Sequence, residues 1–326
     1  MANMVTQIAS LFSVLVFSTA AWGQSAPPAA QDTQNDQAVT TLKVTTRLVG
    51  ISAVVKSKDG EPKEGLAKDD FVLKQDGKEE PIQYCSRGSD LPLSLALMVD
   101  TSGSQETFIG DESLASDVFF ESMLGRAQDR AMLVQFDSSV LQLKSMTNSA
   151  NALHLALSSV RSRGNASQGT LLNDAVFLVA KNALAHETGR KAMVILSDGG
   201  DNGSRRTIAE AIEQAQRGDV QIYSILYSLF NDLSGGAPGR APGADTGLAA
   251  LQRLSESTGG RVFTVSRNLS LREIYQEIGD DLRFQYELGY RPPQDTKPDS
   301  YHKLELKAKD KKLMVQARRG FFEPPA

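Results

Sequence analysis

The sequence has 326 residues, of which 40% are hydrophobic and 23% are charged, a balance typical of an ordinary globular protein with room for about two domains. Its formal net charge of −4 provides no basic surplus to displace phosphate counterions, which excludes a general nucleic-acid binder. No window approaches the roughly 18 continuous apolar residues that a membrane-spanning helix needs.

The first residues resemble an export signal. Residues 8–17 (IASLFSVLVF) form a short apolar core, and residues 21–23 (AWG) offer a cleavage site, although no Lys or Arg precedes Lys43. We therefore expect residues 1–23 to be a signal peptide and the protein to be exported, to the periplasm or the cell exterior. The alternative is a hydrophobic N-terminus without a targeting role.

The segment that follows is polar. Between Ser25 and Ala38 there is no apolar residue larger than Ala, so this stretch cannot bury enough surface to offset its ordering entropy. We expect residues 24–40 to form a disordered linker.

Two segments, residues 41–89 and 285–322, show the strand period of two. Each has too few strands to close a core alone. We hypothesise that both fold together as one β-sandwich, with an α/β domain inserted between them. The alternating apolar positions include Leu42, Val44, Leu48, Tyr286, Leu288 and Tyr290.

Between these segments, residues 90–284 alternate apolar strands with helices. The near-continuous apolar runs suit a parallel sheet covered on both faces. We predict a doubly wound, mostly parallel α/β sheet of Rossmann-like type with right-handed crossovers. The expected strands are 93–99, 131–136, 192–196, 220–226 and 261–265, and the expected helices are 105–124, 150–160, 171–185, 207–216, 247–257 and 271–282.

The first strand of this domain ends in the run DTSGS. Asp100 stands at the carboxyl end of the strand, and Ser102 and Ser104 flank a glycine, so a tight turn can aim both hydroxyls the same way. Oxygen ligands of this kind suit Mg²⁺ or Mn²⁺, which prefer octahedral oxygen shells. One loop cannot fill six positions, so other strand ends must contribute.

Two further turns offer oxygen atoms at the same edge. Thr170 opens a predicted helix in the stretch GTLLNDA, and Asp198 follows the predicted strand MVIL in the stretch SDGG. Because the carboxyl ends of parallel strands lie on one edge of a sheet, these three turns converge in space. The sequence therefore predicts a divalent-cation site formed by Asp100, Ser102, Ser104, Thr170 and Asp198.

With these residues in place, the chain resembles the von Willebrand factor type A family over roughly residues 90–284. The metal-ion-dependent adhesion site of that family has the pattern Asp-x-Ser-x-Ser, then a Thr, then an Asp, which residues 100–104, Thr170 and Asp198 match. The resemblance implies that the Ser and Thr hydroxyls bind Mg²⁺ (or Mn²⁺ or Ca²⁺) directly, while Asp100 and Asp198 act mostly through bound waters. It also implies that a carboxylate from a protein or another ligand fills the remaining position.

The whole chain also resembles the secreted von Willebrand A-related proteins common in acidobacteria, in which a short β segment precedes the A domain. The stretches DGEPKEGLAKDDFVLKQDGK, YELGYRP and VQARRGFF carry this likeness. It implies an exported, non-catalytic binding or adhesion protein, and it leaves the ligand and the oligomeric state open.

Other interpretations of these residues stay open. The run DTSGS alone is also a strand-to-helix turn whose side chains cap the helix, and the module can be a structural one with an empty metal site. A metal-assisted phosphoesterase with Asp100 as nucleophile generally needs a second acid two residues later, where this chain has Ser102. Among the neighbouring acids, we expect Asp174 to hydrogen-bond backbone and Asp137 and Asp201 to be solvated.

Other enzyme classes lack their motifs. The sequence has no Gly-x-Ser-x-Gly elbow, no Gly-x-Gly-x-x-Gly and no phosphate loop ending in Gly-Lys-Ser/Thr. His154, His186 and His302 are isolated in the sequence and lack zinc-site spacing, so we expect surface or packing roles for them. Cys85 is the only cysteine, which excludes an internal disulfide, and we expect a buried structural thiol. We predict that the protein is not an enzyme.

Overall fold

A computed structural model describes residues 48–87, 91–105, 116, 119–162, 169–227, 244–293 and 297–324. The chain divides into two units, Met1–Thr45 and Thr46–Ala326, and all of the described residues belong to the second. The predicted signal peptide and linker lie outside the described residues. In the part of the chain that is described, no helix is both long enough and apolar enough to cross a membrane.

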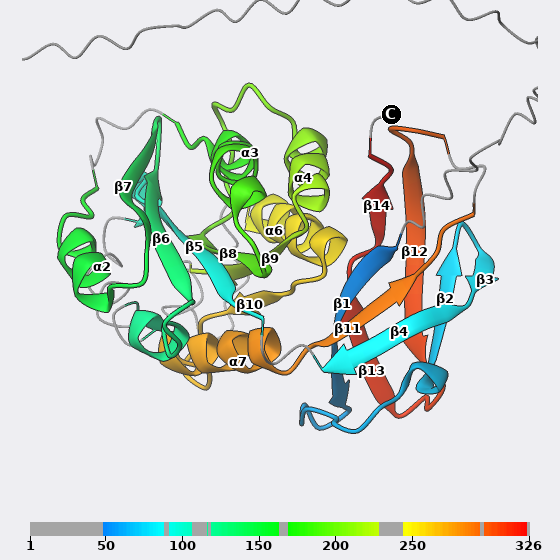
Figure 1. Ribbon diagram of the computed structural model, residues 1–326. Coiled ribbons are helices and arrows are strands. Elements are labelled where there is room, and N and C mark those ends of the chain that lie inside the picture. The colour runs from blue at the N-terminus through cyan, green and yellow to red at the C-terminus, as the bar shows by residue number, and fades with distance from the viewer. Residues whose placement is uncertain are drawn as a thin grey trace, which may run out of the picture. The chain divides into compact units, whose positions relative to one another are not determined.

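The helices and strands are labelled in Figure 1. The strands are β1 Val49–Ser57, β2 Phe71–Gln75, β3 Lys78–Glu80, β4 Ile82–Arg87, β5 Leu93–Asp100, β6 Arg130–Phe136, β7 Val140–Thr147, β8 Arg190–Ser197, β9 Val220–Leu226, β10 Val262–Thr264, β11 Tyr286–Tyr290, β12 Tyr301–Ala308, β13 Leu313–Ala317 and β14 Gly320–Phe322. The α-helices are α2 Ala150–Leu157, α3 Leu172–Asn182, α4 Ile208–Arg217, α6 Ala244–Thr258 and α7 Leu271–Arg283, and the short 3₁₀ helices are η1 Lys68–Asp70, η2 Gly103–Gln105 and η4 Leu184–His186.

Six strands form one mixed sheet in the order β10-β9-β8-β5-β6-β7. Neighbouring strands run parallel except for β6 and β7, which are antiparallel. The chain starts in the middle with β5, moves outward through β6 and β7, and then returns to β8 on the other side of β5. The order therefore reverses between β5 and β8, which is the topological switch point at which open α/β sheets place their ligands. This arrangement confirms the predicted mixed α/β architecture with a mostly parallel sheet.

Strand β7 is absent from the sequence prediction. It lies at the edge of the sheet, and its side chains are exposed or only partly buried along its whole length. It therefore lacks the apolar run that marks the buried strands. The helix predicted at 105–124 falls mostly outside the described residues, and its residues 119–123 are helical.

Successive side chains of β5 point to opposite faces of this sheet. Leu95 and Leu97 belong to one buried cluster with residues of α2 and α7, whereas Ala96 and Met98 belong to another with residues of α3, α4 and α6. The same division of the helices is visible in Figure 1. Because helices cover both faces, every residue of β5 is buried, and the carboxyl end of the strand is held rigidly in the fold.

Two of the described α-helices, α4 and α7, begin with a capping box. The side chains of Thr207 and Ser270 accept hydrogen bonds from the backbone N–H three residues on, and Glu210 and Glu273 return the contact to the cap backbone. These capping boxes satisfy donors that a helix leaves unpaired at its start, and they set the first residues of α4 and α7.

The two flanking segments share their sheets. One four-stranded sheet has the order β13-β1-β11-β4 and the other has the order β14-β12-β2-β3. In the first sheet β1 pairs antiparallel with β11 and β13, and in the second β2 pairs antiparallel with β12. Strands from both ends of the described chain therefore complete each sheet.

Both segments also supply the same buried cluster. Its members include Ile51 and Leu73 from the first segment and Leu288 and Tyr290 from the second. The Tyr290 hydroxyl donates a hydrogen bond of 2.8 Å to Oε1 of Gln75, which is itself buried. A buried polar pair of this kind is satisfied only when the two segments are in register.

Ion pairs hold the end of α7 to β1. The Asp281 side chain is fully buried, and its two oxygens lie 2.7 Å from Lys56 Nζ and 2.9 Å from Arg261 Nε. Two cations thus offset the cost of burying this carboxylate. Two residues after α7 ends, the Gln285 side-chain amide donates to Gln221 Oε1 at 2.9 Å.

The shared core predicts the effect of one substitution in β11. Leu288 is 1% exposed and lies on a strand between β1 and β4, so Leu288→Ala should lower the free energy of unfolding by about 2–5 kcal/mol. Leu155→Ala is the matched control, because this leucine is 70% exposed and its truncation should cost less than about 0.5 kcal/mol. Urea denaturation measures both values, and equal effects would contradict the shared core.

Candidate metal centre

The predicted site lies at the carboxyl edge of the six-stranded sheet. Asp100 is the last residue of β5, and Ser197 is the last residue of the neighbouring strand β8. Both therefore lie at the switch point of the strand order, which is where open α/β sheets place their ligands.

The Asp100 carboxylate is completely buried and is held by two donors. Its Oδ1 accepts a hydrogen bond of 2.9 Å from the Ser102 backbone N–H, and its Oδ2 accepts one of 2.6 Å from the Ser197 hydroxyl. Burial raises the pKa of Asp100 to about 6, and the charge of Asp198 acts in the same direction, while the Ser197 and Ser102 hydrogen bonds oppose the rise. The group is a desolvated carboxylate with a fixed orientation.

Ser197 is a site residue that the sequence prediction does not include. Its hydroxyl donates to Asp100 and accepts a hydrogen bond of 2.9 Å from the Gly199 backbone N–H, so it joins the turn after β8 to the end of β5. In the sequence, Ser197 is distinguished only by standing directly before Asp198, at the end of the predicted strand. A side chain at that position can reach the end of the neighbouring strand.

The turn after β8 depends on a close backbone approach. Gly199 has φ +80°, and a Cβ at this position would lie 2.2 Å from the backbone oxygen of Gly247 in α6. Only glycine fits this contact. The neighbouring Asp198 is half-buried, and its Oδ1 accepts a hydrogen bond of 2.9 Å from the Gly200 backbone N–H. Asp198 is therefore held at the strand end that the prediction assigns to it.

Thr170 is tied to the same edge through its backbone. Its N–H donates to Asn202 Oδ1 at 2.6 Å, and its carbonyl accepts a hydrogen bond of 3.2 Å from the Asn202 N–H. The next residue, Leu171, donates its N–H to the Asp137 carbonyl at 2.8 Å, one residue beyond the end of β6. Because β6 lies beside β5, this contact places the Thr170 turn at the same sheet edge as Asp100.

The remaining predicted ligands lie on the turn after β5. Ser102 is 6% exposed, and Ser104 belongs to the 3₁₀ helix η2. The side chain of Ser104 lies outside what the structure describes. The approach of its hydroxyl to those of Ser102 and Thr170 stays a prediction.

Three further acids lie near this edge, and the structure confirms the prediction for two of them. Asp174 accepts hydrogen bonds from the backbone N–H groups of Arg205 and Arg206, at 3.1 and 2.8 Å, as predicted. Asp201 is exposed, also as predicted. The prediction that Asp137 is solvated is wrong: this residue is 1% exposed, and its Oδ1 accepts hydrogen bonds from the backbone and hydroxyl of Ser139. Its carboxylate closes the turn between β6 and β7, and β7 is the strand that the sequence prediction lacks.

Two other candidates also differ from expectation. Cys85 is partly buried and packs against the shared β core, and burial is the first cause that raises the pKa of its thiol. His302, which is isolated in the sequence, contacts Asp76 and Ser300 in the structure. The prediction treats His302 as isolated because Asp76 lies 226 positions away in the chain.

The donor set suits a hard divalent cation. Among the described residues, no Lys or Arg forms an ion pair with Asp100 or Asp198, so the two carboxylates at this edge are not neutralised by a described side chain. In the described part of the chain, no three His, Cys, Asp or Glu side chains lie close enough together to hold a metal ion. The predicted ligands include only two such residues, and hydroxyls supply the other oxygen atoms.

No family model and no curated protein matches the chain. Solved structures that are similar to this chain include an aerotolerance-related membrane protein from Bacteroides fragilis. It is 16% identical, with a TM-score of 0.45, over 58% of this chain and 98% of that chain. The vWF domain of the type V pili tip protein Mfa5 from Porphyromonas gingivalis is 14% identical, with a TM-score of 0.42, over 59% of this chain and 96% of that chain.

A third similar structure is the pilus adhesin SpaC from Lactobacillus rhamnosus GG in an open conformation. It is 12% identical, with a TM-score of 0.45, over 78% of this chain and 48% of that chain. Similarities of this size do not assign the chain to a family.

The bridging role of Ser197 gives a prediction. In Ser197→Ala, the buried Asp100 carboxylate loses one donor and the Gly199 N–H loses its acceptor, so the free energy of unfolding should fall by about 1–3 kcal/mol. Ser158→Ala removes an exposed hydroxyl that donates to the Leu155 carbonyl, and we expect less than about 0.5 kcal/mol. Chemical denaturation compares the two variants. A Ser197 variant as stable as the control would show that the bridge does not hold the site.

Proposed function

We propose that this protein is an exported, non-catalytic binding or adhesion protein that captures an acidic ligand through a divalent cation. The cation, Mg²⁺ or a similar ion such as Mn²⁺ or Ca²⁺, is held by Ser102, Ser104, Thr170, Asp100 and Asp198. The hydroxyls bind it directly, and the carboxylates act mostly through water, as the resemblance to the von Willebrand factor type A family implies.

One observation carries the proposal. A fully buried, hydrogen-bonded Asp100 lies at the switch point of the sheet, with Asp198 at the next strand end and no described cationic side chain paired with either. Burial and then the charge of Asp198 raise the pKa of Asp100, and a bound cation would offset both effects.

The chemistry of this ligand set favours binding over reaction. Neutral hydroxyls and carboxylates held one shell out neutralise the ion less than direct carboxylate ligands do, so the ion stays electrophilic. A partner carboxylate supplies both the missing charge and the missing oxygen. Two unit charges 4 Å apart attract by ~4 kcal/mol at an effective dielectric near 20, and a divalent ion doubles this before desolvation is subtracted. One Asp or Glu can thus anchor a modest interface.

The rival function as a metal-assisted phosphoesterase has less support. Such an enzyme needs Asp100 to attack phosphorus, but both carboxylate oxygens of Asp100 accept hydrogen bonds and the residue has no exposed surface. The other rival, a structural module with an empty site, leaves the charge of the two carboxylates uncompensated.

The remaining parts of the proposal concern the chain outside the α/β domain. We interpret the two four-stranded sheets as one β-sandwich, because both contribute to a single buried cluster. Export rests on the apolar stretch and cleavage site within residues 1–23.

Cation binding is tested by calorimetry. The full chain should release or absorb heat on titration with Mg²⁺ or Mn²⁺ and should melt at a higher temperature with the ion, because the ion binds only the folded protein. Asp100→Ala should lose both effects and keep its circular dichroism spectrum. Asp59→Ala, which removes an exposed acid in a β-segment turn, should keep them. Collapse of the Asp100 variant would indicate a structural role for this residue.

Ligand capture is tested with a partner screen. Proteins and polysaccharides from the native organism should bind the immobilised chain in Mg²⁺, and a chelator should elute the specific ligand, since the ion bridges both partners. Blocking the ligand's carboxylates should have the same effect as the chelator. Binding that survives both treatments would exclude capture through the cation, and turnover of a generic phosphoester would favour the enzyme.

A further inference from the structure

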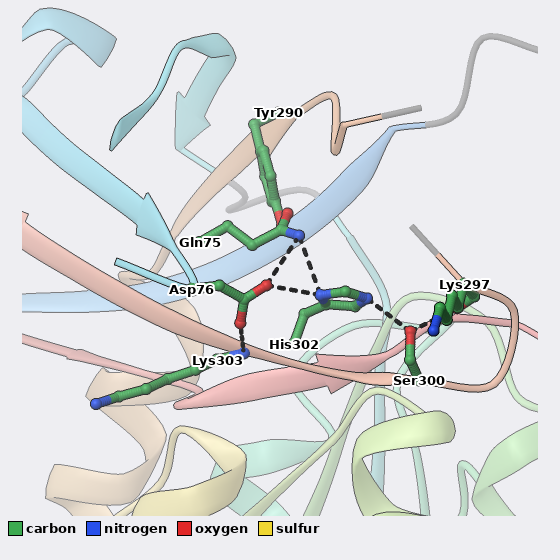
Figure 2. Close-up of polar contacts among 7 residues, drawn as sticks. All are labelled: Gln75, Asp76, Tyr290, Lys297, Ser300, His302 and Lys303. Atoms are coloured by element: carbon green, nitrogen blue, oxygen red, sulfur yellow. Dashed lines mark hydrogen bonds and ion pairs between the residues drawn. The ribbon is translucent and has the colours of Figure 1, made fainter. Parts of the chain in front are cut away.

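A second polar site lies among the β segments. Residues from β2, β3, β12 and the connection after β11 line a pocket of about 340 Å³. Asp76, Lys78, Lys297, Ser300 and His302 all border it. Figure 2 shows the side chains of Asp76, Ser300 and His302 joined in a row of hydrogen bonds.

The row has a defined atomic order. Ser300 Oγ lies 2.8 Å from His302 Nε2, and His302 Nδ1 lies 2.7 Å from Asp76 Oδ2 and 3.2 Å from Gln75 Nε2 (Figure 2). This is the order of a nucleophile, a base that can take its proton, and a carboxylate that orients the base. The three residues come together because β12 pairs antiparallel with β2, which ends one residue before Asp76.

The carboxylate and the ring are both held in place. Asp76 has φ +50° in the turn between β2 and β3, and its Oδ1 accepts a hydrogen bond of 2.9 Å from the Lys303 backbone N–H. Burial alone raises the pKa of Asp76, but hydrogen bonds from His302, Lys303 and Gln75 lower it below its ordinary value, so the group is ionised at neutral pH. The His302 ring packs 5.5 Å from the Phe321 ring, and its side chain is 13% exposed.

The Ser300 hydroxyl has two partners and only one proton. It donates to the Lys297 carbonyl at 2.5 Å, so the contact with Nε2 requires the ring to donate as well. A ring that carries a proton on both nitrogens donates to Ser300 through Nε2 and to Asp76 through Nδ1. Loss of one ring proton leaves Nε2 as an acceptor, and rotation about the Cβ–Oγ bond of Ser300 turns the hydroxyl proton toward it.

We propose that Ser300 is an activated nucleophile, with His302 as its general base and Asp76 as the orienting carboxylate, and that it accepts the acyl group of carboxylic esters. This site is separate from the proposed cation site, so the binding role of that site does not depend on it. The activity goes beyond the proposed function, whose non-catalytic character then applies to the cation site alone. It also assigns His302 a role other than packing.

The proposed ester hydrolysis needs no reactant other than the ester and water, and Ser300 and His302 carry its proton transfers. Ser300 Oγ attacks the ester carbonyl carbon while its proton passes to His302 Nε2, and the carbonyl electron pair moves to oxygen. The tetrahedral species collapses, the bond to the alcohol oxygen breaks, and the alcohol leaves with the proton from Nε2. Water then attacks the acyl group, gives a proton to Nε2, and the carboxylic acid leaves as Ser300 regains its proton.

The pocket indicates the class of ester. Lys78 and Lys297 line this pocket together with Glu80, and a lysine ammonium turned toward Ser300 would stabilise the oxyanion or an acidic group on the substrate. We therefore expect small, polar or anionic acyl esters to react faster than long apolar ones.

The test uses the full chain with a fluorophosphonate probe and p-nitrophenyl acetate. The probe should phosphonylate Ser300 with release of fluoride, as peptide mass spectrometry reads out. Ser300→Ala should lose the label and the ester reaction, and His302→Gln should slow both by about 100-fold or more, because a general base contributes that much. Asp76→Asn, which tolerates the positive φ, should also slow them.

Three further measurements separate catalysis from a structural role. Ser57→Ala removes another half-buried β-segment serine and should react like the unmodified protein. Ser300→Cys should keep a measurable ester reaction. The unmodified protein should react faster as the pH rises from 5 to 8, the range in which histidines ordinarily titrate, and His302→Gln should lose this dependence.

The proposal is overturned if the label forms on another residue, or if Ser300→Ala reacts as fast as the unmodified protein. Equal rates for folded His302→Gln and the unmodified protein would also overturn it. If the His302 variant does not fold, the comparison of Ser300→Ala with Ser57→Ala decides by itself.

Discussion

The hydrogen bond from the Ser197 hydroxyl to the Asp100 carboxylate is the contact on which the proposed cation site depends. It joins two residues 97 positions apart, at the ends of the paired strands β5 and β8, where the strand order reverses. Burying a carboxylate is costly unless hydrogen bonds and opposite charge compensate it. The protein supplies the hydrogen bonds from Ser197 and Ser102, and the proposed ion supplies the charge. In this proposal the ion offsets the same desolvation that raises the pKa of Asp100.

The β segments impose a second constraint, because each sheet needs strands from both ends of the described chain. Strand β11 lies between β1 and β4, so the chain has to leave the β unit, build the α/β sheet, and return in register. The buried ion pair between Lys56 and Asp281 ties the return point at the end of α7 to β1. The same pairing of distant strands brings Asp76 beside His302. Both polar sites of this protein thus arise from contacts between residues far apart in sequence.

The parts predicted well are those in which a local pattern is also the physical cause. Strand β9 has the predicted bounds and the other buried strands of the α/β sheet are predicted to within two residues at each end, because their continuous apolar runs are what the two helical layers cover. The prediction misses strand β7 and the burial of Asp137 for one reason. An edge strand such as β7 needs no apolar run, and unless β7 is predicted, no turn after β6 is expected in which Asp137 would be buried. The sequence prediction places His302 in no site for a similar reason. Its partner Asp76 is brought beside it by the register of β2 and β12, which no local pattern shows.

The sequence by itself determined the mixed α/β class, the places where strands end, and the residue types at those ends, because hydrophobic period and turn chemistry act over a few neighbouring residues. Only the tertiary structure decided which strand ends are adjacent, that Ser197 bridges Asp100 to the next turn, and that Ser300, His302 and Asp76 form a row. These are decided by strand order and register, which depend on how distant segments pack together and not on the residues beside them.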